Sequence, residues 1–171
     1  MKAKFLAALA VGALTASAIG VRAANDQFTF PAAFAEGVEY LSVDKPSKQV
    51  HVFYAPQSAI DAAKAGKPMP EGTVFVGVHY NAKLDKDGNP EKDANGRFIK
   101  TDILAYTVME KRKGWGTEYP DNIRNGEWEY QAFTAAKQPN PNAKLTACFE
   151  CHKPLPQASD YLFSYGKMAG K

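Results

Sequence analysis

A short segment near the C-terminus brings two thiols and an imidazole together. It reads Cys148-Phe149-Glu150-Cys151-His152 and contains the only two cysteines of the chain. This C-x-x-C-H pattern is typical of a haem c attachment site, in which each thiol adds to one porphyrin vinyl group and the adjacent imidazole becomes an axial ligand of the iron. The sequence therefore predicts one covalently bound haem c on Cys148 and Cys151, with His152 as the proximal iron ligand.

Two other chemistries use cysteine pairs at this spacing. A redox-active dithiol belongs in a βαβ pattern, whereas residues 137–142, with two prolines and two asparagines, read as a turn. A structural zinc site usually has four ligands, and the other two histidines, His51 and His79, are far away in sequence. Both alternatives are therefore weaker interpretations than a covalent haem.

The N-terminus has the pattern of an export signal. Lys2 and Lys4 precede an apolar run that extends from Phe5 to Val21 and ends in small residues. This pattern predicts a cleaved secretory signal peptide over residues 1–23, and hence a periplasmic protein. An uncleaved membrane anchor is the alternative, but the run of about 17 residues is at the lower limit for a membrane span.

The charge balance of the chain changes when this segment is removed. The formal net charge is +3 over 171 residues, and Lys2, Lys4 and Arg22 account for all of it. A neutral mature chain gives no reason to expect nucleic acid as a partner, or a membrane once the signal is cleaved. The remaining residues, 24–171, form one domain's worth of chain, and we expect a single haem-binding domain.

The middle of the chain is dominated by predicted strands. Residues 72–80 alternate most clearly: their valines share one face, while Phe75, Gly77 and His79 share the other and are positioned to line a cavity. In a later strand, Ile103, Thr107 and Met109 are expected on one face. The four predicted strands are 48–54, 72–80, 98–109 and 128–133.

Helices are fewer and shorter. Ser58 is a candidate N-cap for residues 59–65, with Gly66 ending the helix. Another helix is expected to begin at Thr146, and a third over 159–168. Residues 85–97 are rich in charged and turn residues and predict an exposed loop. The fold class is therefore α+β, a mainly antiparallel sheet packed with a few helices.

With these features the chain resembles the cytochrome P-460 and cytochrome c′-beta family over most of residues 28–168. Besides C-x-x-C-H, the landmarks are the strand end 52–56, the helix to Gly66, the strand start 72–74 and the approach 145–148. The resemblance implies an antiparallel sheet with the haem held against it, and a homodimer. Members of the P-460 branch oxidise hydroxylamine and carry a Lys bonded to the porphyrin, whereas c′-beta members bind nitric oxide at an open iron site under an apolar cap.

The two branches differ at few positions, and two of them are informative here. The family register places Gly77 where the cross-linking Lys of the P-460 branch stands, and Thr107 close to the position of its pocket Glu. Both departures argue against hydroxylamine oxidation by the family mechanism.

The residues that face the iron on the distal side have more than one interpretation. Phe75 is either a steric cap over the iron or a core aromatic. His79 is a candidate iron ligand, a candidate hydrogen-bond donor to a bound ligand, or a half-exposed side chain near a strand end. A methionine is a further candidate sixth ligand, with Met109 favoured over Met69 and Met168.

Three functions follow from these alternatives. The favoured one is a binding protein that captures a small gaseous or nitrogen-oxide ligand, such as nitric oxide, at an open iron position. The second is an oxidoreductase acting on hydroxylamine or nitric oxide. The third is a six-coordinate electron-transfer cytochrome, for which a redox protein is the expected partner.

Overall fold

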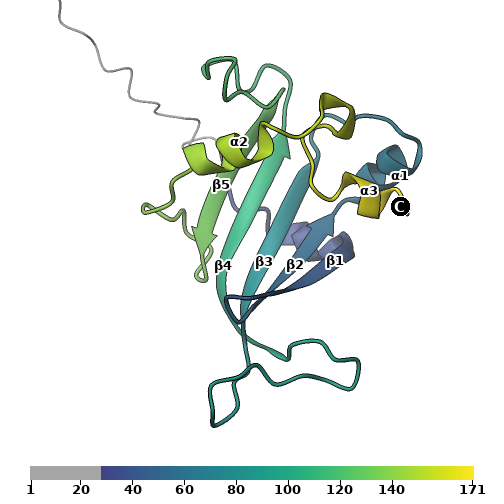
Figure 1. Cartoon of the computed structure of the whole chain (residues 1–171). Coiled ribbons are helices and arrows are strands. Elements are labelled where there is room, and N and C mark those ends of the chain that lie inside the picture. Colours follow the sequence, from purple (N-terminus) through teal and green to yellow (C-terminus); the bar gives the residue numbers. More distant parts are fainter. Residues whose placement is uncertain (1–27) are drawn as a thin grey trace, which may run out of the picture.

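A computed structural model describes residues 28–171, and its centre is a single five-stranded antiparallel sheet (Figure 1). The strand order is β1-β2-β3-β4-β5, so each strand pairs with its neighbours in the chain. The expected α+β fold with an antiparallel sheet is confirmed. The strands are β1 (Val38–Lys45), β2 (Gln49–Ala55), β3 (Val74–Ala82), β4 (Lys100–Lys111) and β5 (Trp128–Thr134).

The alternation along β3 defines the two faces of the sheet. Val76 and Val78 are each 1% exposed and pack on what we call the back face. Phe75, Gly77 and His79 point to the opposite, front face, as the sequence predicts for an alternating strand.

One predicted face assignment on β4 is wrong. The pairing of β3 with β4 shifts between His79 and Tyr80, which pair with Ala105 and Ile103, so Leu104 is an extra residue in the ladder. Such an extra residue reverses the alternation. Ile103 therefore packs on the back-face cluster, while Thr107 stays on the front.

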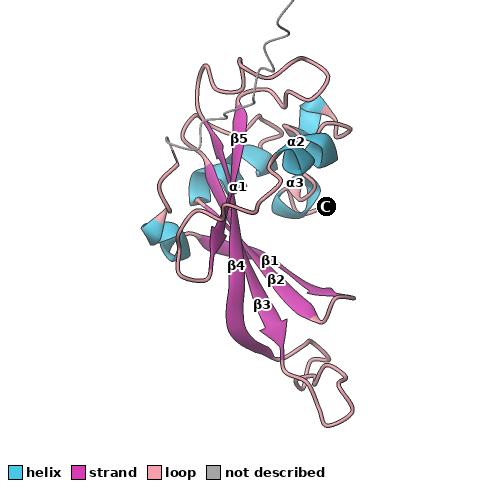
Figure 2. Cartoon of the chain, turned by 90° about the vertical axis from the view of Figure 1, so that its left-hand side faces the viewer, coloured by secondary structure: helices cyan, strands magenta, loops and turns pink. Residues whose placement is uncertain are grey.

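The back face is closed by aromatic side chains. Phe30 stands edge-on to Tyr106 and Phe133, with ring centroids 4.8 and 5.3 Å away, and Phe34 does the same to Tyr54 at 5.2 Å. The 3₁₀ helix η1 (Ala32–Glu36) carries Phe34 across the sheet, and it lies on the side opposite to α2 and α3 in Figure 2.

The helices α1 (Gln57–Lys64), α2 (Thr146–His152) and α3 (Tyr165–Met168) belong to the other core cluster, which packs on the front face. Ser58 is not the N-cap of α1: the helix begins at Gln57, after Pro56, and has no side-chain cap. Gly66 does terminate it, with a left-handed φ of 67°. The front core contains Ala55, Ala59, Ile60, Ala63, Met69, Phe75, Met109, Tyr119, Trp128, Tyr130, Phe149, Leu162 and Met168.

The C-terminal segment is only partly helical. The expected helix over 159–168 is replaced by η2 (Gln157–Ser159), a turn, and α3. The interruption falls at Asp160 and Tyr161, both of which have a left-handed backbone, with φ of 51° and 58°. This conformation cannot continue a right-handed helix.

The exposed loop is confirmed as an arm that projects from one end of the sheet (Figure 1). Its turns are organised by Asp85 and Asp93, whose carboxylates accept backbone N–H groups two and four residues further on. Over residues 28–171, no helix combines the length and apolar character that a membrane span requires. The predicted signal peptide, residues 1–23, lies outside the described residues.

Candidate functional site

His152 ends α2 with its imidazole oriented by the backbone. Its Nδ1 lies 2.7 Å from the carbonyl oxygen of Tyr161. Because a carbonyl only accepts, Nδ1 carries the proton and the Nε2 lone pair stays free for a metal. The ring is half-buried between Tyr130 and Phe163, each 5.0 Å away between centroids. Burial lowers the pKa of His152, and the bond to Tyr161 opposes this effect.

The two thiols lie on the same short helix and are not joined in a disulfide. Cys148 and Cys151 are three residues apart, a spacing that places them on one helical face. Cys151 is exposed, and Cys148 is partly buried against the front core. Burial raises the pKa of the Cys148 thiol, with a smaller contribution from Cys151.

Phe149 and Asn125 fix α2 on the sheet. The Phe149 side chain is 1% exposed, and its ring lies 4.2 Å from Tyr119 and 4.7 Å from Tyr130 between centroids. The Asn125 amide, itself fully buried, donates to the Phe149 carbonyl at 3.1 Å and to the Tyr130 hydroxyl at 3.0 Å. Aromatic packing and one amide therefore set the position of the thiols over β5.

Small and polar residues occupy the centre of the front face. The register places Phe53, Gly77 and Thr107 side by side on β2, β3 and β4. A Cβ atom built on Gly77 would lie 2.7 Å from the Thr107 Oγ1 and 3.1 Å from the Phe53 ring. These two neighbours thus fill the space in which a side chain at position 77 would begin.

Two histidines lie beside this row. The rings of His51 and His79 stack with centroids 3.8 Å apart and an interplanar angle of 9°. The His79 Nε2 lies 3.2 Å from the Thr107 Oγ1, and the His51 Nε2 lies 3.2 Å from the Gln49 side-chain oxygen. Burial, with a smaller contribution from His51, lowers the pKa of His79 to about 4, so His79 is neutral at pH 7.

The structure thus brings Gly77, His79 and Thr107 together on the front face. His51 joins them without a signal in the sequence, because only the strand register makes it the direct partner of His79. Phe75 is 5% exposed and packs against Tyr40 and Trp128, at 6.2 and 5.7 Å between centroids, as a core aromatic does.

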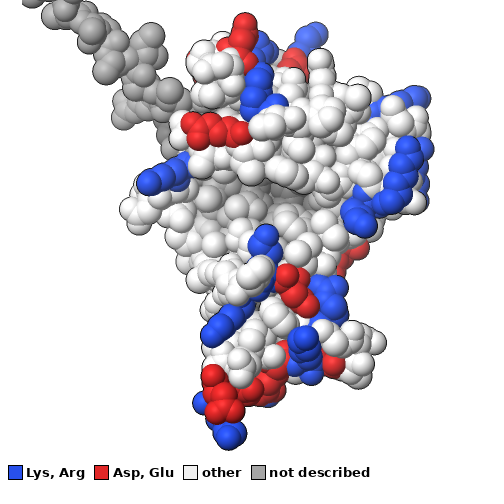
Figure 3. All heavy atoms as spheres, in the orientation of Figure 1, with Lys and Arg blue, Asp and Glu red and all other residues white. Residues whose placement is uncertain are grey.

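The methionines considered as iron ligands are all part of the front core. Met69 and Met168 are 3% exposed, and Met109 is 9% exposed. Beside this core, the front of the molecule is hollowed next to α2, and Figure 3 shows that the hollow is lined by uncharged residues. Phe163, 63% exposed, is the most exposed large apolar side chain of the described residues.

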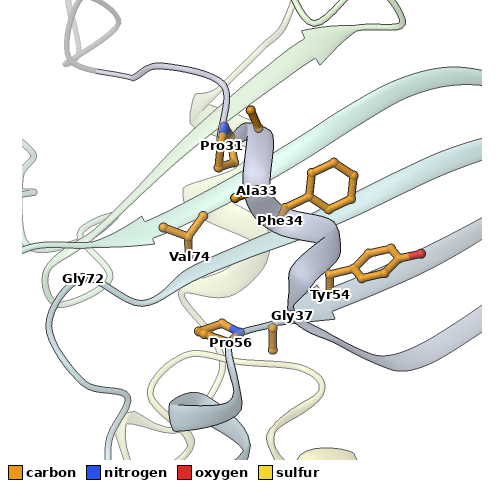
Figure 4. Close-up of a pocket in the computed structure, with 10 residues that line it drawn as sticks. Pro31, Ala33, Phe34, Gly37, Tyr54, Pro56, Gly72 and Val74 are labelled. Atoms are coloured by element: carbon orange, nitrogen blue, oxygen red, sulfur yellow. The ribbon is translucent and has the colours of Figure 1, made fainter.

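A separate cavity of about 340 Å³ lies on the other side of the sheet. It opens between η1 and the adjoining ends of β2 and β3, where Phe34, Tyr54 and Val74 face it (Figure 4). The cavity contains neither the thiols nor a histidine, and it is distinct from the front-face hollow.

The front face has the chemical composition of a haem-binding site. Two unpaired thiols, an imidazole with a free Nε2 and an uncharged hollow together match the donors and lining that a covalently attached haem requires. The fold and the site therefore define the chain as a haem-binding α+β protein.

The comparison with protein families agrees with this class. The family model described as Cytochrome P460 matches residues 34–164, which is more than half of the chain, so the chain belongs to the cytochrome P460 family. Membership in this family implies that the protein is a cytochrome with a haem cofactor. A search of the curated proteins returned no match.

Proposed function

We propose that this protein is a mono-haem c-type cytochrome that binds a small ligand such as nitric oxide at an open iron position. Cys148 and Cys151 would hold the haem through thioethers, and the His152 Nε2 would ligate the iron. The bound haem would supply an iron with one coordination position for an exogenous ligand. The rest of the function then depends on the side chains around that position.

The observation that carries this proposal is the packing around Gly77. The enzymatic branch of the family uses a Lys at the corresponding position, but here Phe53 and Thr107 lie within 3.1 Å of a Cβ at position 77. A side chain there would have to displace both neighbours. The Thr107 hydroxyl also stands near the position of the acidic group in that branch, and it hydrogen-bonds to His79.

The candidate sixth ligands have other partners. His79 is held between Thr107 and the His51 ring, and Met109 is part of the packed front core. These contacts favour an iron that is open to an exogenous ligand. The stacked imidazoles and the uncharged hollow give this face no excess of charge, an environment in which a small uncharged ligand needs no counter-ion.

The optical spectrum of the ferrous protein tests the proposal directly. We expect a high-spin, five-coordinate spectrum that changes on addition of nitric oxide. A low-spin spectrum that nitric oxide leaves unchanged would refute an open site. His79→Ala and Met109→Leu identify the ligand in that case, because the variant that lacks it would become high-spin. A strongly red-shifted Soret band would instead support the cross-linked, enzymatic form.

Covalent attachment is tested separately by mass spectrometry. The purified protein should carry one haem that survives denaturation, and Cys148→Ala combined with Cys151→Ala should carry none. Retention of covalent haem by the double variant would contradict attachment through these thiols.

Export and assembly are part of the same proposal. We expect cleavage after residue 23, delivery to the periplasm and a homodimer. N-terminal sequencing of protein from the periplasmic fraction, and light scattering of the purified protein, measure these three properties. A mature chain that begins at residue 1 would contradict export by cleavage.

A further inference from the structure

Asp160 is a buried carboxylate located immediately before the residue that holds His152. It is 7% exposed. Its Oδ2 accepts hydrogen bonds from the Lys111 Nζ at 2.7 Å and from the Met69 backbone N–H at 2.8 Å, and its Oδ1 accepts one from the Trp128 Nε1 at 3.3 Å. One carboxylate therefore connects the end of β4, the start of β5 and the loop after α1.

These bonds hold a backbone conformation that the chain does not adopt readily. Asp160 and Tyr161 are consecutive non-glycine residues with left-handed φ values. Such a pair is strained and persists only where the surroundings fix it. The Asp160 N–H donates to the Gln157 carbonyl at 2.8 Å, and the buried Leu162 donates from its N–H to Ser159 at 3.0 Å, so the turn is fixed on both sides.

This turn positions the carbonyl group of Tyr161 next to His152. The carbonyl oxygen of Tyr161, a residue with a left-handed backbone, is the acceptor of the His152 Nδ1 proton. A carbonyl in this position selects the imidazole tautomer and increases the basicity of the ligating nitrogen. If Asp160 moves, the Tyr161 carbonyl moves with it.

We propose that Asp160 is a positioning residue for His152: its buried bonds to Lys111, Met69 and Trp128 fix the turn that aims the Tyr161 carbonyl at the axial imidazole. The inference rests on the proposed function, in which His152 ligates the iron. Asp160 itself touches neither His152 nor the haem. It acts through the peptide unit that carries the Tyr161 carbonyl. Its loss should change the electron-donor strength of the His152 imidazole as well as the stability of the fold.

The variants are chosen so that the anchor is lost without leaving a buried charge unpaired. Asp160→Asn removes the negative charge, and Lys111→Met in the same chain removes the ammonium that would otherwise lose its partner. Of the three bonds to the Asp160 carboxylate, Trp128→Phe removes only the one to Oδ1. Asp44→Asn is the matched control, because Asp44 also accepts from a cation and a backbone N–H, Arg97 and Phe98, but supports the arm.

The iron–histidine stretching frequency of the ferrous protein is the main readout, with the reduction potential beside it. The Asp160→Asn and double variants should shift the stretch to lower frequency and the potential upward, because a misaligned carbonyl leaves His152 a weaker donor. Trp128→Phe should give a smaller shift of the same sign. Asp44→Asn should change neither quantity, even if it lowers the melting temperature.

The imidazole tautomer gives a readout that does not depend on the haem. In ¹⁵N spectra of the apoprotein, His152 should be a single Nδ1–H tautomer in the wild type and a mixture in the double variant. An iron–histidine frequency and a His152 tautomer equal to the wild type in both Asp160 variants would overturn the inference.

If Asp160→Asn does not fold, the charge-balanced double variant and Trp128→Phe decide by the same criteria. A wild-type protein without an iron–histidine mode would refute the proposed function instead, and the tautomer would still test Asp160.

Discussion

The two faces of the sheet are built from the same strands but are filled in different ways. On the back face, Phe30, Phe34, Tyr106 and Phe133 pack edge to face, and Val76 and Val78 are almost fully enclosed. On the front face, the packed core lies beneath α1, α2 and the C-terminal turn. The same face carries a glycine, a threonine and two stacked histidines in contact with one another, and it is hollowed next to α2.

This difference separates the residues that make the fold from those available to a ligand. Burial of the back-face aromatics supplies stability that does not depend on a cofactor. The front face leaves small residues and a free imidazole nitrogen beside a hollow, an arrangement that favours a large planar group. Substitutions on the two faces should therefore change different quantities.

The largest effect is expected from Phe133→Ala on the back face. Phe133 is 1% exposed and its ring packs against Phe30, so truncation should reduce the free energy of unfolding by about 3–5 kcal/mol. Phe53→Ala, its front-face counterpart, removes a half-buried ring and should reduce it by less than about 2 kcal/mol. Urea unfolding measures both.

The spectra of the same pair sharpen the comparison. Phe53→Ala should change the nitric oxide spectrum of the ferrous protein, whereas Phe133→Ala should leave it unchanged. The reverse pattern would show that the hollow is not the ligand side.

The next largest effect concerns Glu129, a buried carboxylate on β5. It is 1% exposed, accepts a bond from the Tyr119 hydroxyl at 3.0 Å, and has its Oε1 buried without a partner among the described residues. Burial raises the pKa of Glu129 from 4.5 to about 7. The native carboxyl therefore binds its proton more tightly than the unfolded one, so Glu129 contributes stability that is lost as the pH rises from about 4.5 to about 7. This loss opposes the gain from His79, whose pKa is lowered to about 4.

Replacing this group should abolish the loss. The stability of Glu129→Gln relative to the wild type should increase across that range, and at pH 8 the variant should exceed the wild type by about 3 kcal/mol. Glu71→Gln, at an exposed position, is the control and should keep the wild-type slope. Parallel slopes for the wild type and Glu129→Gln in urea unfolding at several pH values would contradict a buried, protonated carboxyl.

A smaller effect is expected at Gly77 on the front face. Gly77→Ala brings a methyl group against Thr107 and Phe53 and should destabilise the protein by about 1–3 kcal/mol. Gly166→Ala is the matched control: nothing lies within 4 Å of its Cβ position, and a helical alanine should be neutral or stabilise by up to about 1 kcal/mol. Equal thermal midpoints for the two variants would show that Thr107 and Phe53 can shift at little energetic cost to make room for the methyl group.

The smallest effect belongs to neither face. Lys83 and Glu91 form a 2.7 Å ion pair in the arm, with side chains 53% and 34% exposed. Lys83→Ala should change the free energy of unfolding by less than about 1 kcal/mol, and less still in high salt. A large loss would mean that the arm supports the sheet.

The sequence was sufficient for the strands whose side chains alternate and for the attachment motif, since both depend on local patterns. It did not identify β1, where polar Glu39, Ser42 and Asp44 lie along an edge strand and a register shift at Tyr40 breaks the period. Ile103 was predicted on the wrong face because one extra residue in the β3–β4 ladder, Leu104, reverses which side of the sheet the residues before it face.

The remaining site residues depend on contacts between distant parts of the chain. His51 joins the site only because antiparallel register sets it opposite His79. Asp160 lies 49 residues from Lys111 and 91 from Met69 along the chain. Two left-handed residues without a glycine also have no signal in composition, because their conformation is imposed by those partners.

The strand order has a consequence for how the molecule is made. Every strand pairs with its neighbours along the chain, so the sheet is assembled from contacts of short sequence separation, which favours rapid folding. The thiols and the turn that orients His152 all follow β5. Under the proposed attachment of haem c, the sheet would therefore form while residues 146–171 remain accessible for thioether formation at Cys148 and Cys151.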